Sequence, residues 1–268
     1  ELGDQMDNIS TMSKQQLNEV KIILTDIDDT LTTDGRLKSN AYSALENLSN
    51  SGFIVIPVTG RCAGLCDHIA RMWPVNGVVG ENGAFFFSYN HESKKMQQTY
   101  CQTTIERKEN HLALHDIKNS ILKNVSGSAL ASDQDYRHTD LAIDFAEDVS
   151  LLSPEKIKDI VKIAEKAGAM AKVSSIHVNC WIGGHSKLST SLSTLDQVFG
   201  ISKSNIQNEV LFIGDSPNDS MMFDYFAKSV GVANVMNCID ELNQPPKYIT
   251  SKHSGDGFVE LADLLLRR

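Results

Sequence analysis

The stretch IILTDIDDTLTTDG, residues 22–35, passes from apolar to acidic within a few residues. A short apolar run that ends at a turn signal is typical of a buried β-strand. Asp26, Asp28 and Asp29 follow this run directly, and no basic residue stands among them. An isolated acidic cluster is most often a solvated turn, so the role of these carboxylates depends on what the rest of the chain brings near them.

Apolar runs alternate with helical patterns along the segments that flank this stretch. Residues 53–58 and 210–213 are further apolar runs, and residues 39–52 follow a helical period up to Gly52, a common helix end. Four apolar residues fall on one face of that helix: Ala41, Ala44, Leu45 and Leu48. Alternation of this kind predicts parallel strands joined by crossover helices, which is the pattern of an α/β fold.

The alternation is interrupted in the middle of the chain. After Gly83 come an aromatic run at 84–90, a polar linker at 91–98, and then helical patterns mixed with strand patterns. The first pattern returns after Gly184. One domain therefore interrupts another. We expect a core domain made of residues 1–83 and 185–268, and an inserted α+β domain made of residues 84–184.

The composition argues against several classes of partner. The 268 residues carry a net charge of -9 and no run of lysine or arginine, which disfavours nucleic acid or an anionic membrane as the main partner. No apolar segment has the length of a membrane helix, and the opening residues lack a signal-peptide pattern, so we expect a cytoplasmic protein. The oligomeric state stays open between a monomer and a homodimer. Five scattered cysteines suit reduced thiols better than disulfides: Cys62, Cys66, Cys101, Cys180 and Cys238.

Polar residues that follow the apolar runs are expected to meet at one place, because ligands of an open α/β sheet bind beyond the carboxyl ends of its strands. The candidates are Asp26, Asp28, Thr59, Gly60, Arg61, Asp215, Asn218 and Asp219, with Lys187 at the start of the helix that re-enters the core. Clustered carboxylates repel one another and need a cation, and Mg²⁺ prefers oxygen ligands. A carboxylate can also attack phosphorus, so this set predicts phosphate chemistry.

Four short motifs, in this order, resemble those of a known superfamily. DIDDT, VTGR, the downstream Lys187 and GDSPND are similar to the four motifs of the haloacid dehalogenase superfamily. The position of the insert between Thr59 and Lys187 resembles subclass IIB, the Cof-like phosphatases. Ser216 and Pro217 depart from the glycine that many Cof-like members carry after the aspartate.

The resemblance implies an α/β fold with a Rossmann-like parallel-sheet core and an inserted α+β cap domain. It also implies a magnesium-dependent phosphomonoesterase that acts through an aspartyl-phosphate. The substrate would be a small phosphorylated metabolite such as a sugar phosphate, a mannosyl-phosphoglycerate or phosphoglycolate. A phosphosugar mutase with the same motifs and a non-catalytic phosphate-binding relative remain alternatives. A signalling receiver domain is disfavoured, because it has no such insert and its threonine and lysine follow all its acidic residues.

The resemblance further implies a role for each motif residue. Asp26 would be the nucleophile, and Asp28 the general acid that protonates the leaving group and then the base that activates water. Thr59 would hold the phosphoryl oxygens, and Lys187 would neutralise charge. The Mg²⁺ site would consist of Asp26, the backbone carbonyl of Asp28, and Asp215, with Asp219 orienting Lys187 or a metal-bound water.

The inserted domain is expected to select the leaving group of the substrate, as lids do. Arg137 offers a guanidinium fork to a carboxylate or a second phosphate, or it is an ordinary surface arginine. His177 and Asn179 lie two residues apart and share one face of a strand. The predicted substrate-binding residues are Gly60, Arg61, Asn82, Arg137, His177 and Asn218.

Overall fold

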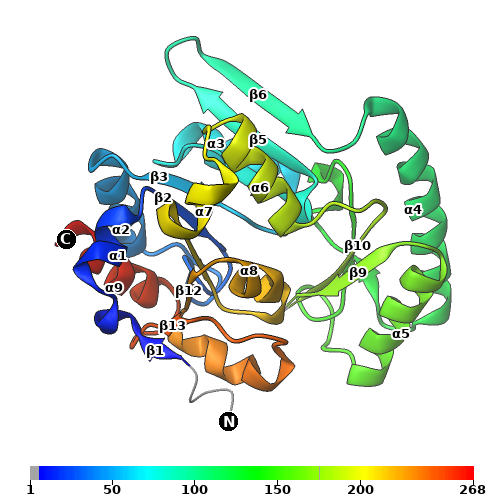
Figure 1. Ribbon diagram of the computed structural model, residues 1–268. Helices are drawn as coiled ribbons and strands as arrows, with labels where there is room; N and C mark the ends of the chain where they lie inside the picture. Colours follow the sequence, from blue (N-terminus) through cyan, green and yellow to red (C-terminus); the bar gives the residue numbers. More distant parts are fainter. Residues whose placement is uncertain (1–5, 175) are drawn as a thin grey trace.

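The computed structural model describes residues 6–174 and 176–268, and it is built around a six-stranded parallel sheet (Figure 1). The strands lie in the order β1-β13-β12-β11-β2-β3, so the three strands from the end of the chain lie between strands from its beginning. Their bounds are β1 Asp7–Asn8, β2 Ile22–Thr25, β3 Ile54–Pro57, β11 Val210–Gly214, β12 Lys228–Gly231 and β13 Tyr248–Ile249. The carboxyl ends of β2, β3 and β11 therefore open at one edge of the sheet.

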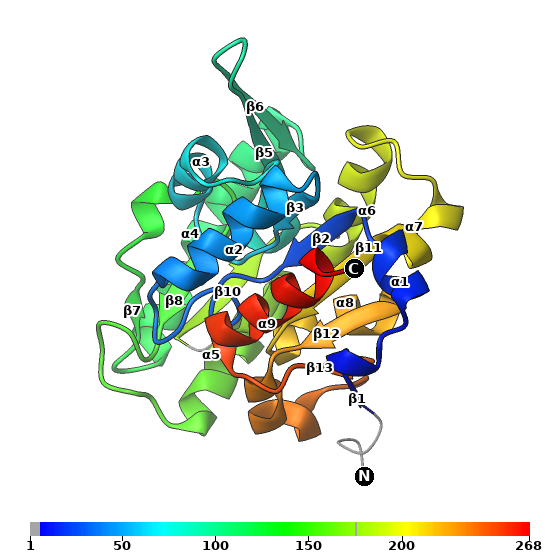
Figure 2. The ribbon, with the colours of Figure 1, turned by 90° about the vertical axis from the view of Figure 1, so that its left-hand side faces the viewer.

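Helices cover both faces of this sheet, because successive side chains of each strand point to opposite sides. Ile23 and Val55 pack in one apolar cluster, while Leu24 and Ile56 pack in the other. The first cluster is covered by α1 Lys14–Glu19, α2 Ser39–Asn50, α3 Ala63–Met72 and α9 Ser254–Leu266 (Figure 2). The second is covered by α6 Lys187–Gln197, α7 Lys203–Glu209, α8 Ser220–Tyr225 and the 3-10 segment η6 Ala233–Glu241. Burial on both faces explains why the core strands are apolar without interruption.

The inserted segment forms a second layered unit (Figure 1). Its four strands form a sheet in the order β7-β8-β10-β9, and every neighbouring pair is antiparallel. The strands are β7 Ala129–Leu130, β8 Leu141–Asp144, β9 Met170–Val173 and β10 His177–Trp181, and the helices are α4 Thr104–Asn124 and α5 Pro154–Lys166. Both helices pack on one face of the sheet, where Ile121 of α4 and Ile160 of α5 meet Val178. The predicted α/β fold class, with a parallel core and an inserted α+β unit, is confirmed.

A third sheet connects these two parts. Strands β4 Val78–Gly80, β5 Phe85–Asn90 and β6 Lys95–Tyr100 are antiparallel neighbours. Phe85 and Phe87 of β5 pack in the first core cluster, so this hairpin packs with the core even though residues 84–184 were assigned to the insert. The domain boundaries stay a prediction.

The polar linker predicted at 91–98 is wrong for residues 95–98, which form most of β6. The strand lies at the edge of the three-stranded sheet, and four of its six side chains are exposed. An edge strand pairs through its backbone with β5 alone and needs no apolar face, so hydropathy carried no strand signal there.

The described chain also bears on the expectations about membrane helices and cysteines. Between residues 6 and 268, with residue 175 left aside, no helix combines the length and the hydropathy that crossing a bilayer requires. All five cysteines are free thiols, and three of them, Cys62, Cys66 and Cys180, are buried.

Candidate active site

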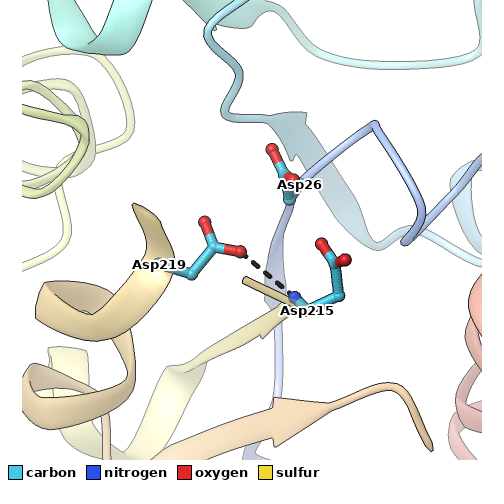
Figure 3. Close-up of side chains that lie close together, drawn as sticks. All are labelled: Asp26, Asp215 and Asp219. Carbon is cyan, nitrogen blue, oxygen red and sulfur yellow. Dashed lines mark hydrogen bonds between the residues drawn. The ribbon is translucent and has the colours of Figure 1, made fainter. Parts of the chain in front are cut away.

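The carboxyl edge of the core sheet gathers three carboxylates. Asp26 follows β2, Asp215 follows β11, and Asp219 lies in the short 3-10 turn η5 Pro217–Asp219. One oxygen atom of each lies within 4.8 Å of the others (Figure 3). A carboxylate oxygen of Asp219 accepts a hydrogen bond from the backbone N–H of Asp215 at 3.1 Å, which fixes the loop that carries both residues. The structure thus brings together acids that are about 190 positions apart in the sequence.

Lys187 completes this group, which we call the strand-end cluster: Asp26, Asp215, Asp219 and Lys187. The ammonium of Lys187 lies 3.0 Å from Asp26 Oδ1 and 2.9 Å from Asp219 Oδ1. The lysine is the first residue of α6, where the backbone at Ser186 passes directly over Gly83. A Cβ atom built on Gly83 would lie 2.1 Å from the carbonyl oxygen of Ser186, so only glycine permits this approach.

The strand-end cluster holds more negative than positive charge in a buried place. Burial raises the pKa of Asp26 to about 7, although Lys187 opposes the change. Burial, together with the neighbouring Asp26 and Asp219, raises the pKa of Asp215 to about 9. Burial alone would lower the pKa of Lys187, but the carboxylates of Asp219 and Asp26 raise it, so the ammonium is retained. One lysine does not balance three carboxylates, and the cluster favours a further cation.

The possible metal-ligand atoms of Asp26, Asp215 and Asp219 fit a hard divalent ion. All are carboxylate oxygens, and Mg²⁺ is commonly held by one or two carboxylates with the remaining positions left to water and phosphate oxygens. Asp215 is held in place for such a role, because the Thr30 hydroxyl donates to its Oδ1 and the Asn234 amide to its Oδ2, each at 3.1 Å. The predicted metal residues Asp26, Asp215 and Asp219 therefore lie together.

Asp28 lies beside the cluster and is bound to Arg61. The guanidinium of Arg61 donates to the Asp28 carboxylate through Nε, at 3.0 and 3.1 Å, and through Nη2, at 2.6 Å. The Asp28 side chain keeps 34% of its surface exposed, compared with 9% for Asp26. Asp26 and Asp28 of the DIDDT motif thus have different surroundings, since Asp26 is buried against a lysine and Asp28 is open to the cavity with an arginine partner. This ion pair was not predicted from the sequence.

The remaining core residues predicted for the site differ in their access to solvent. Thr59 is fully buried, and its hydroxyl accepts a hydrogen bond from the Arg61 N–H. Asn82 is buried with a positive φ of 56°, and its side-chain oxygen accepts from Asn218 at 3.2 Å. The amide nitrogen of Asn82 has no hydrogen-bond partner within residues 6–174 and 176–268. A Cβ atom built on Gly60 would lie 3.1 Å from Asn82, so these residues pack tightly beside the cavity.

A cavity of about 710 Å³ lies between the core and the inserted domain. The core contributes Asp26, Asp28, Gly60, Arg61, Lys187, Asp215 and Asn218 to its wall, and the insert contributes Arg137, Lys172, His177 and Asn179. This volume falls within the range of small-molecule sites. Lys172 of β9 was not predicted, because a single lysine in a half-exposed strand carries no distinguishing signal in the sequence.

A second charged group, buried except for the partly exposed Asp133, joins the insert to the core, and we call it the joint cluster: Glu81, Asp133, Arg137 and Asp140. Arg137 Nε and Nη2 donate to Asp133, at 3.0 and 2.8 Å, and Nη1 donates to Asp140 at 3.0 Å and to the carbonyl oxygen of Gly60 at 3.1 Å. The guanidinium is therefore held by the protein itself, and only 2% of the side chain is exposed. The substrate contact expected of Arg137 stays a prediction.

Glu81 anchors the same joint from the core side. Its carboxylate accepts from the backbone N–H groups of Ala63, His138 and Thr139, at 2.9, 2.8 and 2.7 Å, and also from the Thr139 hydroxyl. It is fully buried at a positive φ of 43°, a backbone conformation that is costly for a side-chain-bearing residue. The strained backbone is held because Glu81 ties α3 of the core to the 138–139 segment of the insert.

His177 and Asn179 lie on the same face of β10, as their spacing predicted, and both line the cavity. The His177 Nε2 atom lies 2.8 Å from a carboxylate oxygen of Glu147. The amide nitrogen of Asn179 donates to Asp140 at 3.2 Å, so this residue also touches the joint cluster.

The fold and the site together indicate a class of α/β enzyme. In this class the ends of parallel strands hold carboxylates around one lysine, and an inserted domain lies beside the site. The model of the haloacid dehalogenase-like hydrolases matches residues 23–261, and the chain belongs to that family. This confirms the predicted superfamily and the predicted class of enzyme, a hydrolase.

Individual relatives span nearly the whole chain. Phosphoglycolate phosphatase 1 of Saccharolobus solfataricus is 27% identical over 253 residues, which cover 92% of this chain and 96% of the relative. Phosphoglycolate phosphatase of Methanobrevibacter smithii is 26% identical over 244 residues, which cover 90% and 96%. The solved structure of Thermoplasma acidophilum 0175 superposes with a TM-score of 0.71 at 17% identity and covers 92% of this chain and 98% of its own.

Proposed function

We propose that the protein is a magnesium-dependent phosphomonoesterase that forms an aspartyl-phosphate on Asp26. The observation that carries this proposal is the setting of Asp26: its Oδ1 accepts from Lys187, while no donor to its Oδ2 is found in the described chain. One carboxylate oxygen is thus held, and the other is free to attack. The cavity that Asp26 lines offers room for a phosphate ester.

In the first half-reaction, Asp26 forms a bond to phosphorus while the bond from phosphorus to the leaving oxygen breaks. Once Asp28 has separated from Arg61 and taken up a proton from solvent, it gives that proton to the leaving oxygen. Lys187 stays between Asp26 and Asp219 to offset negative charge. When bound, Mg²⁺ supplies charge that keeps Asp26 ionised and stabilises the phosphoryl oxygens. The leaving alcohol then departs from the cavity.

In the second half-reaction, Asp28 takes a proton from a water molecule, and that water attacks phosphorus. The bond between phosphorus and Asp26 breaks, which restores the carboxylate and releases inorganic phosphate. Asp28 must separate from Arg61 in order to exchange protons with substrate and water, so we expect the ion pair of 2.6 Å to loosen during turnover. Thr59 and Asn82, both buried beside the cavity, are the proposed supports of the phosphoryl site.

The proposed substrate is a small phosphorylated metabolite, and phosphoglycolate is the first to test because two relatives carry that activity in their names. Sugar phosphates and mannosyl-phosphoglycerate remain in the same class. A phosphosugar mutase would use the same residues but would return the phosphoryl group to a sugar.

The decisive experiment is a phosphate-release screen of the purified protein over a panel of phosphate esters, with and without Mg²⁺. We expect inorganic phosphate from at least one ester, only with the metal and without any added bisphosphate. Turnover that requires a sugar bisphosphate would favour the mutase, and absence of both reactions would refute the proposal.

A further inference from the structure

One cation on the cavity wall stands apart from the others. Four lysine and arginine residues line the cavity: Arg61, Arg137, Lys172 and Lys187. Three of them are engaged with carboxylates, because Arg61 binds Asp28, Arg137 binds Asp133 and Asp140, and Lys187 binds Asp26 and Asp219. For Lys172, the described residues provide neither an ion pair nor a side-chain hydrogen bond. Its ammonium is thus the cation on this wall that a ligand can recruit without breaking an existing pair.

The strand register directs Lys172 toward the site. Lys172 of β9 pairs with Asn179 of β10, so the two side chains emerge on the same face of the inserted sheet. Asn179 and His177 on that face also line the cavity, and the opposite face is packed against α4 and α5 through Val178 and Cys180. Lys172 is solvent-exposed, and its long flexible side chain can reach a ligand that enters between the domains.

The position of Lys172 determines which part of a substrate it can meet. The phosphoryl end belongs at the strand-end cluster in the core, where Asp26 and Lys187 lie. Lys172 belongs to the inserted domain, on the opposite side of the same cavity, so it faces the leaving group. Three further carboxylates line the wall outside the strand-end cluster, those of Asp28, Asp29 and Glu241. An anionic leaving group would be repelled there unless a cation received it.

We propose that Lys172 determines substrate specificity by binding a carboxylate on the leaving group, which makes phosphorylated hydroxy acids the preferred substrates. This proposal rests on the proposed phosphatase function and narrows its substrate class. The charge-assisted hydrogen bond from an ammonium to a carboxylate contributes about 1.5–3 kcal/mol, which corresponds to roughly 10- to 150-fold in affinity. We therefore expect discrimination in KM rather than in kcat, because the contact lies away from the reacting atoms.

The test compares esters that differ only by a carboxylate. The short pair is phosphoglycolate with 2-hydroxyethyl phosphate, and the long pair is 6-phosphogluconate with sorbitol 6-phosphate. Two lengths are needed because a cavity of about 710 Å³ accepts either. The variants are Lys172→Met and Lys172→Arg, and Lys158→Met, an exposed lysine of α5 outside the cavity wall, is the matched control.

For the wild type and for K158M, we expect a higher kcat/KM with the acid than with the neutral ester in at least one pair. In K172M this preference should fall about tenfold or more through a rise in the KM of the acid, and K172R should restore most of it. An equal loss on acid and neutral esters, or an unchanged preference in both pairs, would overturn the proposal while leaving the phosphatase function intact. If the wild type hydrolyses no ester at all, it is the proposed function that fails.

Discussion

The strand-end cluster and the joint cluster each hold three carboxylates and one cation in largely buried surroundings, yet they are built differently. In the joint cluster, Glu81 alone accepts four hydrogen bonds from fixed donors, and Arg137 is clamped between two aspartates. In the strand-end cluster, Asp26 receives one ammonium and opens onto the cavity. One set of carboxylates is satisfied by the chain, and the other leaves capacity for a ligand.

Charge alone does not separate the two clusters. Burial raises the pKa of Asp140 in the joint to about 7, as it does for Asp26. What differs is access: the Asp140 side chain is fully buried against Arg137 and Asn179, whereas Asp26 and Asp215 line the cavity. A buried acid therefore marks a functional site only when solvent or a ligand can reach it.

The largest effect is expected from Asp26→Asn. Removal of the proposed nucleophile should lower kcat by about 10⁴-fold or more, as for nucleophiles of other hydrolases. The free energy of unfolding should not fall, because the amide removes a carboxylate whose pKa is raised by burial and like charges. Phosphate release and denaturant unfolding measure the two quantities. Wild-type activity in this variant would exclude the aspartyl-phosphate on Asp26.

Metal removal should have the next largest effect. Chelation should reduce phosphate release by about a thousandfold, since a bound divalent ion supplies several kcal/mol of transition-state stabilisation. Added Mg²⁺ should raise the melting temperature of the wild type by several degrees at saturating concentration, because it binds the folded chain.

Matched variants assign that metal effect to the strand-end cluster. Asp215→Asn should abolish the thermal shift, whereas Asp224→Asn, an exposed acid on α8, should keep it. A full shift in the Asp215 variant would place the ion elsewhere.

A substitution in the joint cluster should change the stability of the protein. Glu81→Gln should lower the free energy of unfolding by about 2–4 kcal/mol, because the amide replaces an acceptor by a donor among fixed N–H groups. Urea unfolding measures the change, and Glu165→Gln, an exposed acid on α5, is the control. An unchanged midpoint with unchanged slope would show that the four hydrogen bonds of Glu81 do not stabilise the joint.

The difference between the clusters also explains what could be predicted from the sequence. Asp26, Thr59 and Asp215 each follow an apolar run, and the ends of parallel strands converge, so pattern alone places them at one edge. Lys187 follows from the return of the core pattern after the insert. These positions depend on the alternation of apolar runs and helical patterns along the chain, which can be read locally from the sequence. The parallel sheet follows from that alternation.

The joint cluster was not predictable in the same way. Glu81 is bound by residues of the insert that follow it by more than fifty positions, and their meeting depends on how two domains pack. For Arg137 a local signal existed, because Asp133 stands four residues before it and Asp140 three residues after it. Acids at that spacing favour an internal ion pair over a free substrate-binding fork.

The smallest expected effect concerns His185, a buried imidazole that follows β10 near the return to the core. Neither of its ring nitrogens has a hydrogen-bond partner in the described chain, and it stacks on Trp181 with ring centroids 5.9 Å apart. Burial lowers the pKa of His185 to about 4. In the unfolded chain the imidazole binds a proton below its ordinary pKa of about 6.5, whereas the folded protein resists protonation until about pH 4.

Stability should therefore fall as the pH drops through this window, by about 2 kcal/mol between pH 7 and pH 5 from this residue alone. His185→Phe keeps an aromatic ring beside Trp181 but cannot bind a proton, so its free energy of unfolding should lose about that much less than the wild type over the same range. His68→Phe, at an exposed position of α3, controls for the loss of any imidazole. Parallel pH curves for the wild type and the His185 variant would mean that the ring is hydrated in solution. Glu81 is hydrogen-bonded by the chain, and Asp26 lines the cavity where a ligand can bind it. His185 is buried without either kind of partner, so it destabilises the folded protein only at a pH at which the unfolded chain binds a proton on this residue.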